Sequence, residues 1–333
     1  MKVSKKVLGL IGVASAITLL AGCASAGSST VTTAADKPLT IAFVMGAESD
    51  PFFQAMKVGA EAEAKAQGVT LIWQGDPAKY SAETQIPIVD AVLAQQPDGL
   101  VLIPTDPVAL QPSVAKAIAS GIKVANVDTH VNDLSDVTIF VTGDNADGGS
   151  KAADAIATQI GYKAGGTYKV VVGLTSATAT TNVSRLEGFK AQVAAKYPGI
   201  SIVDVAYSES NPETAATNVS NWLTKYPDLS GIFAIDGTNA SGAAAALEAK
   251  GLTGKVALVG YDAYPDNVAK IKSGIFTALI AQDPAAEARL AIKTLVDLIR
   301  NGTKPAQSSV VIPNVTLTSK TSDADFAKYT YVK

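Results

Sequence analysis

Residues 39–73 read LTIAFVMGAESDPFFQAMKVGAEAEAKAQGVTLIW and contain one complete strand–helix–strand unit. β-Favouring apolar runs predict strands at Leu39–Met45 and Val69–Trp73, and an Ala-rich amphipathic run predicts a helix at Phe52–Gln67. Asp50 stands before a proline, as a capping residue stands before the first position of a helix. Apolar strands that alternate with such helices are typical of a parallel sheet with crossover helices.

The same alternation continues along the rest of the chain. Further strands are predicted at Gly99–Ile103, Lys123–Val127, Thr138–Thr142, Tyr168–Gly173, Ile200–Val205, Gly231–Ile235, Val256–Gly260 and Phe276–Ala281. Further helices are predicted at Ala82–Gln95, Ala109–Ser120, Ala146–Ile160, Arg185–Lys196, Glu213–Lys225, Ala240–Lys250 and Ala285–Arg300. This number of parallel strands is too large for a single sheet. We therefore predict an α/β protein with two Rossmann-like lobes of βαβ construction, divided near Gly143.

The junctions between strands and helices predict where a ligand would bind. Asp106, Asn211 and Asp283 precede prolines, as Asp50 does, and each is expected to cap a helix. Most of these junctions lie at the carboxyl ends of strands, where α/β sheets bind ligands. A cleft between the two lobes would collect these loops from both sheets, and such interdomain clefts are favoured small-molecule sites.

The first residues have the pattern of an export signal. Lys2, Lys5 and Lys6 precede a short apolar run at 7–20, which ends in Leu-Ala-Gly-Cys at Cys23. This ending resembles the bacterial lipobox, in which the cysteine is lipidated. We therefore expect a signal peptide over 1–22 and an extracytoplasmic protein anchored to the bacterial membrane only through Cys23. An ordinary signal peptide with an incidental cysteine is the alternative.

The composition limits the possible partners. Residues 23–38 are rich in Ser, Thr and Ala and are expected to form a flexible tether. Removal of the leader lowers the formal net charge from -3 to -6, because the leader holds three lysines and no acidic residue. The remaining chain has no clustered basic stretch, so a nucleic-acid partner is not expected.

Short motifs along residues 39–312 resemble those of the ribose-type periplasmic binding proteins, the type I substrate-binding proteins of sugar ABC transporters. The pentapeptide at 49–53, Ser-Asp-Pro-Phe-Phe, resembles the Asn-Pro-Phe-Phe motif of that family. The other matches follow in the same order: Asp98-Gly99, Pro104-Thr105-Asp106, Val127-Asp128, Asp144-Asn145, Arg185-Leu186-Glu187-Gly188-Phe189, Phe233-Ala234-Ile235-Asp236, Val259-Gly260-Tyr261-Asp262 and Ile280-Ala281-Gln282. Each motif alone is weak, but their common order is specific.

The resemblance implies a fold and a function. Two lobes joined by three hinge strands near Gly143, Gln282 and Pro313 would close on a monosaccharide or polyol, which an ABC permease then receives. The implied lobes are 39–143 plus 283–312 and 144–282 plus 313–333. A monomer is expected. A receptor that serves a chemoreceptor or sensor kinase remains an alternative, because both kinds of partner contact the outer faces of the lobes.

Candidate ligand-binding residues follow from the chemistry of a sugar. Ionised aspartates accept hydrogen bonds from hydroxyl groups, and flat aromatic rings cover the apolar faces of the sugar. The candidates are Asp50, Phe52, Phe53, Trp73, Asp128, Asn182, Asp236, Asp262 and Gln282.

Several candidates also have a purely structural interpretation. Asp50 could be only a helix cap, and one of the two phenylalanines is expected in the core, since adjacent helical residues face different ways. Trp73 could equally line the ligand site or belong to the core. The loop at 178–184, which holds Asn182, matches the family only loosely. Asp128, Asp236 and Asp262 follow buried strands, where an unpaired carboxylate is costly, which favours a functional role. His130 is given no role.

The sequence departs from the ribose-type pattern in its arginines. The two places where that family usually has arginine hold Thr129 and either Asn182 or Val183. This predicts a cleft rich in carboxylates and poor in arginine, which argues against ribose and favours a polyol, a different sugar or a cationic amino sugar.

No motif for catalysis, a cofactor or a metal is present. Paired carboxylates can hydrolyse glycosides, but nothing else in the sequence supports a glycoside-acting enzyme. The single histidine and single cysteine exclude a multi-histidine metal site and a His–Cys dyad in the folded part. No Gly-x-Gly-x-x-Gly follows the first strand, which argues against a dinucleotide enzyme. We therefore expect no enzyme, no cofactor and no metal.

Overall fold

The structure, a computed structural model, describes residues 38–331. The predicted signal peptide, the lipidated Cys23 and all but the last residue of the expected tether lie outside the described residues.

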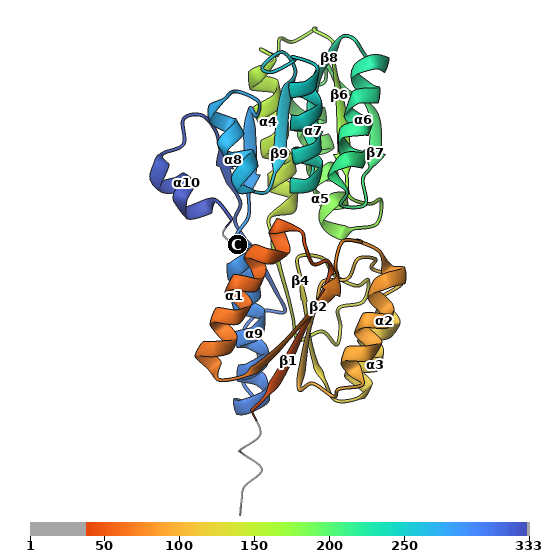
Figure 1. Cartoon of the computed structure of the whole chain (residues 1–333), viewed down its shortest axis with the longest axis vertical. Helices are drawn as coiled ribbons and strands as arrows, with labels where there is room; N and C mark the ends of the chain where they lie inside the picture. Colours follow the sequence, from red (N-terminus) through yellow and green to blue (C-terminus); the bar gives the residue numbers. More distant parts are fainter. Residues whose placement is uncertain (1–37, 332–333) are drawn as a thin grey trace, which may run out of the picture. The chain divides into compact units, whose positions relative to one another are not determined.

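The first of two six-stranded sheets is wholly parallel and is flanked by helices (Figure 1). Its strand order is β11-β5-β4-β3-β1-β2, with every neighbouring pair parallel. The strands are β1 Thr40–Ala47, β2 Thr70–Asp76, β3 Gly99–Leu102, β4 Lys123–Val127, β5 Ile139–Gly143 and β11 Ser309–Ile312. The helices that flank this sheet are α1 Pro51–Gln67, α2 Ala82–Leu93, α3 Gln111–Ala119 and α9 Pro284–Asn301.

The second sheet repeats the arrangement of the first, in the order β12-β10-β9-β8-β6-β7. Only the edge pair β10–β12 is antiparallel. The strands are β6 Tyr168–Leu174, β7 Ile200–Tyr207, β8 Leu229–Ala234, β9 Ala257–Tyr261, β10 Ala278–Ala281 and β12 Val315–Leu317. The helices of this part are α4 Asn145–Gln159, α5 Thr180–Lys196, α6 Pro212–Lys225, α7 Gly237–Ala249, α8 Pro265–Lys272 and α10 Asp323–Tyr329.

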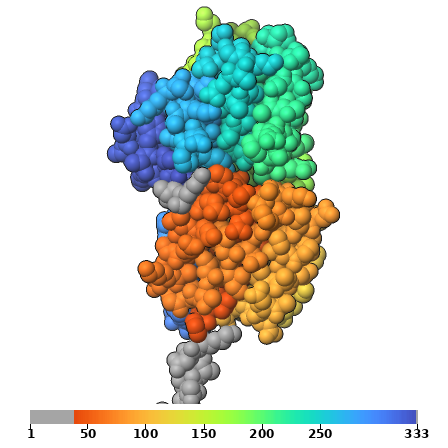
Figure 2. Space-filling model, viewed as in Figure 1, coloured from red at the N-terminus to blue at the C-terminus, as the bar shows by residue number. Residues whose placement is uncertain are grey.

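The two sheets define two lobes, which confirms the predicted fold class. Chain segments of the first sheet and of the second sheet occupy separate halves of the described unit in the space-filling view (Figure 2). The chain passes between the sheets after β5, after β10 and after β11, near the expected hinge positions. A Cβ atom on Gly143 would lie 2.7 Å from Gln282 Oε1 and 3.0 Å from Asn314 Oδ1, so these three crossings pack too closely for a larger residue. The exact lobe boundaries remain a prediction.

Local chemistry explains where the helices begin. The carboxylate or amide oxygens of Asp50, Asn211 and Asp283 accept hydrogen bonds from the first turns of α1, α6 and α9, each of which starts with proline. Asp106 instead accepts from the N–H groups of Val108 and Ala109, and α3 starts later, at Gln111. Asp106 therefore caps a turn before the helix.

The elements that the sequence prediction missed are short or lie at edges. They are α8, the edge strands β11 and β12, and α10. Helix α5 begins at Thr180, so Asn182 lies in its first turn and not in a loop. Strand β2 continues to Asp76, so Trp73 lies in the middle of a strand and not at its end.

Within residues 38–331, no helix is both long and apolar enough to cross a membrane.

Candidate functional site

The carboxyl ends of strands from both sheets meet at a small cavity between the lobes. This inner cavity has a volume of about 40 Å³. Eight of the nine predicted ligand-binding residues line it: Asp50, Phe52, Phe53, Asp128, Asn182, Asp236, Asp262 and Gln282.

Asp128 and Asp262 occupy equivalent positions in the two lobes. Each directly follows the third strand from one end of its sheet, and each has a left-handed backbone, with φ of 59° and 66°. The Asp128 N–H donates to Val141 O at 2.8 Å, and the Asp262 N–H donates to Ile280 O at 2.8 Å. Non-glycine residues with positive φ are uncommon, and such strain concentrates at functional sites.

The Asp262 carboxylate is fully engaged by the protein. One oxygen accepts the Gly237 N–H at 2.9 Å, at the start of α7. The other oxygen accepts Gln282 Nε2 at 2.7 Å and the Tyr331 hydroxyl at 2.9 Å. Because its partners come from three separate segments, this carboxylate ties α7, the second crossing and the C-terminal segment together.

The Asp128 carboxylate, in contrast, accepts no hydrogen bond from any residue between 38 and 331, although the residue is 7% exposed. Burial raises the pKa of Asp128 to about 7; the nearby Arg185 charge lowers it, while the Asp262 and Asp50 carboxylates raise it further. This carboxylate can therefore accept hydrogen bonds from a ligand.

Arg185 lies in the inner cavity, where the sequence predicted carboxylates but did not place an arginine. Its side chain is buried, its Nε donates to Asn145 Oδ1 at 2.8 Å and its Nη1 donates to Ile235 O at 3.0 Å. The guanidinium also lies over the Tyr261 ring, 3.7 Å from the centroid. The sequence prediction recognised Arg185 only as part of a helix motif, because nothing local shows that its side chain points inward.

Close packing of two helices fixes the position of Arg185. A Cβ atom on Gly149 would lie 2.0 Å from Arg185 O, so only glycine lets α4 approach α5 this closely. The cavity therefore holds one cationic group among four aspartates.

Asp50 is both a helix cap and a bridge between the lobes. Its Oδ1 accepts from the Phe52 N–H at 2.9 Å, as a cap does. Two hydroxyl groups of the other lobe also donate to it, Thr238 Oγ1 to Oδ2 at 3.1 Å and the Tyr264 hydroxyl to Oδ1. Burial raises the pKa of Asp50 to about 6, although the hydrogen bonds from Tyr264 and Phe52 oppose this shift.

Asp236 and Asn182 belong to a polar network at the second-lobe wall. Asp236 caps α7 by accepting the Asn239 N–H at 2.8 Å, and it accepts Thr175 Oγ1 at 2.7 Å. Burial raises the pKa of Asp236. Asn182 Oδ1 accepts the Thr175 N–H at 2.7 Å, which orients the amide group toward the cavity.

Both phenylalanines belong to the buried core, where one was expected, and both also line the cavity. Phe52 and Phe53 are buried, and their rings pack edge to face with centroids 5.3 Å apart. They lie at the start of α1, where the helix end itself faces the cavity, so that both side chains reach it.

Trp73 is the one candidate that the structure does not bring to the cavity. Its ring packs against Phe43, with centroids 4.7 Å apart, and Lys57 Nζ of α1 lies 5.9 Å from the ring centroid. Trp73 therefore contributes to the packing between β1, β2 and α1. The position in the middle of an edge strand, away from the carboxyl end, explains the difference.

Sequence reasoning missed six residues of the cavity wall. They are Tyr80, Thr175, Thr181, Arg185, Ser210 and Tyr264. Ser210 follows Glu209, and both have positive φ, 57° and 53°, which a sequence pattern does not reveal. Tyr264 precedes Pro265 at the start of a helix, a signal that could have been found.

His130, for which no role is predicted, lies outside the inner cavity and borders a neighbouring hollow. Its ring packs edge to face against Phe140, and its backbone N–H donates to Thr180 Oγ1 of the other lobe at 3.2 Å. Across the described part of the chain, no three His, Cys, Asp or Glu side chains are grouped as metal ligands.

The chain belongs to the periplasmic binding protein domain family, whose model matches residues 41–304. It is 30% identical over 271 residues to the D-allose-binding periplasmic protein of Escherichia coli, covering 78% of this chain and 85% of that protein. It is also 30% identical over 281 residues to the ribose import binding protein of Bacillus subtilis, covering 83% and 86% of the two chains.

A solved structure has the same fold. The ABC transporter solute-binding protein from Agrobacterium vitis, bound with α-D-tagatopyranose, superposes with a TM-score of 0.83. It is 28% identical in sequence, and the match covers 89% of this chain and all of the other. Membership of this family implies an extracytoplasmic location.

Proposed function

We propose that this protein is a receptor that binds a monosaccharide or a polyol between its lobes and delivers it to an ABC importer. The inner cavity is the observation that carries the proposal. Carboxylates and aromatic rings, the two kinds of group that a sugar needs, meet there from both lobes. The relatives named for allose and ribose support the same class of ligand.

The cavity residues of the first lobe would each make a different contact with the ligand. Asp128 would accept hydrogen bonds from ligand hydroxyls, because its carboxylate accepts none from residues 38–331. Asp50 would exchange the hydroxyls of Thr238 and Tyr264 for those of the ligand. Phe52 and Phe53 would cover an apolar face of the ring.

The second lobe would supply groups that are already held in place. Asp236 and Asn182 are fixed by Thr175, and Gln282 is fixed by Asp262. Arg185 would donate from its remaining N–H groups, since its Nε and Nη1 are engaged by the protein. Such preorganisation lowers the entropic cost of binding.

Binding requires the lobes to separate and close again. The inner cavity, at about 40 Å³, is far smaller than the roughly 300–1,000 Å³ typical of ligand pockets. Hydrogen bonds from Thr238 and Tyr264 to Asp50 and from His130 N–H to Thr180 join the lobes. A ligand would favour closure only by making better contacts in the closed form.

The charges of the cavity favour a neutral ligand. Asp50, Asp128, Asp236 and Asp262 face a single guanidinium group, which is itself partly engaged. An anionic sugar would meet these carboxylates without matching donors. A neutral sugar or polyol fits, and a cationic amino sugar is compatible with the excess of carboxylates.

The finer features of location rest on the sequence. Cys23 would carry the lipid anchor, because Leu-Ala-Gly precedes it after an apolar run. We infer that the protein acts as a monomer and by binding alone, without catalysis.

A thermal-shift screen tests the proposed function. The purified protein would be heated with pentoses, hexoses, polyols, amino sugars and sugar phosphates. A true ligand raises the melting temperature, by an amount equivalent to about 2.7 kcal/mol at a hundredfold excess over its Kd. A neutral sugar or polyol is expected to give the largest shift. A larger shift with sugar phosphates would contradict the proposed ligand class, and no shift with any compound would contradict the receptor function.

A further inference from the structure

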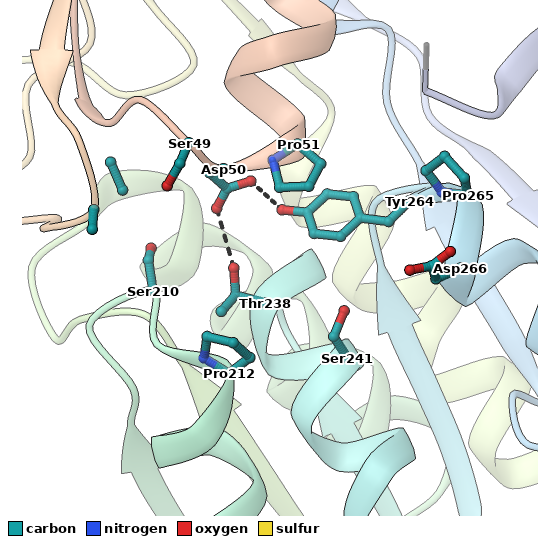
Figure 3. A pocket seen from close by; sticks show the side chains of 12 residues that line it. Ser49, Asp50, Pro51, Ser210, Pro212, Thr238, Ser241, Tyr264, Pro265 and Asp266 are labelled. Atoms are coloured by element: carbon teal, nitrogen blue, oxygen red, sulfur yellow. Dashed lines mark hydrogen bonds between the residues drawn. The ribbon is translucent and has the colours of Figure 1, made fainter. Parts of the chain in front are cut away.

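A second, larger cavity, whose lining Figure 3 shows, shares wall residues with the inner one. Its volume is about 290 Å³, against about 40 Å³ for the inner cavity. We call it the outer cavity. Asp50, Ser210 and Tyr264 line both cavities and thus form the wall between them.

Side-chain hydrogen bonds to one carboxylate hold this wall together. Figure 3 shows Asp50 between the Tyr264 ring and the Thr238 hydroxyl, which approach it from the second lobe. If ligand hydroxyls replace these two donors on Asp50, Tyr264 is released and the two cavities can join. Asp50 can then contact ligand atoms on both sides of the wall.

The lining of the outer cavity suits a sugar ring. Hydroxyl groups of Ser49, Ser210, Thr238 and Ser241 supply donors and acceptors, and Asp50 and Asp266 supply carboxylate acceptors. Pro51, Pro212 and Pro265, each the first residue of a helix, supply apolar surface. A volume near the lower end of typical ligand pockets fits one ring of this kind.

The charges that line the outer cavity favour an uncharged ligand. Two aspartates and no lysine or arginine line the outer cavity, so an anionic substituent would be repelled. A hydroxylated, uncharged ring would satisfy both the acceptors and the apolar surface.

We propose that the outer cavity is a second sugar subsite, so that the protein accepts a neutral disaccharide with one ring in each cavity and Asp50 between them. The proposal rests on the sugar-receptor function and extends it from a single ring to two.

Isothermal titration calorimetry on the full chain tests the second subsite. The monosaccharide probes are D-allose, D-ribose, D-glucose, D-galactose and D-xylose, and the disaccharide probes are maltose, cellobiose, lactose, melibiose and xylobiose. At least one disaccharide is expected to bind about tenfold more tightly than its own constituents, because it gains contacts in the outer cavity.

A substitution that fills only the outer cavity gives the matched test. Ala78 is exposed and lines the outer cavity but not the inner one, whereas its neighbour Lys79 is exposed and lines neither. Ala78→Trp should weaken disaccharide binding by about tenfold or more and leave monosaccharide binding within about twofold, whereas Lys79→Trp should change neither.

The outcomes separate the subsite from the receptor function. Monosaccharide binding with no disaccharide binding as tightly as its constituents would overturn the second subsite and leave the receptor function intact. Equal weakening of both ligand classes by Ala78→Trp would also overturn the subsite. Failure of every monosaccharide and disaccharide to bind would overturn both proposals.

Discussion

Asp128 and Asp262 have the same backbone setting in the two lobes but opposite side-chain surroundings. Both follow a central strand, both have positive φ, and both donate their N–H to the neighbouring strand at 2.8 Å. Three protein groups donate to the Asp262 carboxylate, whereas none within residues 38–331 donates to that of Asp128.

The difference shows that position in the fold does not decide the role of a residue. The strand end brings both carboxylates to the inner cavity, but the C-terminal segment and the second crossing occupy only Asp262, through Tyr331 and Gln282. Asp262 therefore stabilises the arrangement of its lobe, and Asp128 is left to accept from a ligand.

The largest expected effect is a loss of stability on Asp262→Asn. The amide would place a donor against one of the three donors that the carboxylate now satisfies, which should lower the free energy of unfolding by about 3 kcal/mol. Asp128→Asn is the matched control, because asparagine tolerates the same left-handed backbone and no protein hydrogen bond is lost there. Urea unfolding followed by circular dichroism measures both, and equal losses would remove the distinction between the two aspartates.

For ligand affinity we expect the reverse order, with a larger effect of Asp128→Asn than of Asp262→Asn. Asp128→Asn replaces a charged acceptor with a neutral amide and should weaken sugar binding roughly 30-fold, since hydrogen bonds to charged groups contribute about 1.5–3 kcal/mol. Calorimetric titration with the best ligand of the thermal-shift screen measures this. Unchanged affinity in Asp128→Asn would show that the carboxylate does not contact the ligand.

The raised pKa values predict opposite pH dependences for stability and binding. Folding favours the neutral forms of Asp50 and Asp128, whose pKa values rise from 3.8 to about 6 and about 7. Their contribution to the free energy of unfolding is therefore complete below pH 3.8 and is lost as the pH rises through 6 and 7.

Sugar binding to the ionised Asp128 should instead strengthen as the pH rises. Well below pH 7 the affinity is expected to fall by about tenfold per pH unit, since the ionised fraction falls by that factor. Titrations between pH 5 and about 8 measure the slope, and the slope due to this group should vanish in Asp128→Asn. The same slope in the variant would assign the dependence to another residue.

The smallest expected effect is a change in stability at Glu287, a carboxyl group near Asp128 and Asp262. It is fully buried in the first turns of α9, and neither of its oxygens has a hydrogen-bond partner among residues 38–331. Burial raises the pKa of Glu287 well above its ordinary value, and the Asp128 charge adds to this. Glu287→Leu should therefore raise the free energy of unfolding by about 1 kcal/mol.

Urea unfolding at two pH values checks the effect of Glu287→Leu. The gain should be larger at pH 8 than at about pH 5, because the unfolded chain releases the Glu287 proton as the pH rises whereas burial retains it in the folded protein. A loss of stability at both values would mean that the carboxyl group has a structural partner after all.

Much of the fold could be predicted from the sequence because it is encoded locally. Alternation of apolar strands and amphipathic helices, together with caps such as Asp50 and Asn211 before proline, predicted ten of the strands and eight of the helices to within a few residues. The missed elements β11, β12, α8 and α10 are short and lie at edges, where the apolar pattern is weak.

The site could be predicted only in part. A polar residue after a buried strand is a local signal, which is why Asp128, Asp236 and Asp262 were found. The inward direction of Arg185 and the packing of Trp73 against Phe43, away from the cavity, depend on how helices and strands pack, and a single sequence does not reveal that.

The sequence by itself determined a two-lobed α/β protein with carboxylates at the strand ends, because strand burial, helix capping and strand-end chemistry act between near neighbours in the chain. Only the tertiary structure decided which carboxylates accept hydrogen bonds from the protein and which remain available to a ligand. Thr238 and Tyr264 lie 188 and 214 residues beyond Asp50, and Tyr331 lies 69 residues beyond Asp262. Partners so distant in sequence meet only when the lobes are assembled, and within residues 38–331 none of them donates to the Asp128 carboxylate.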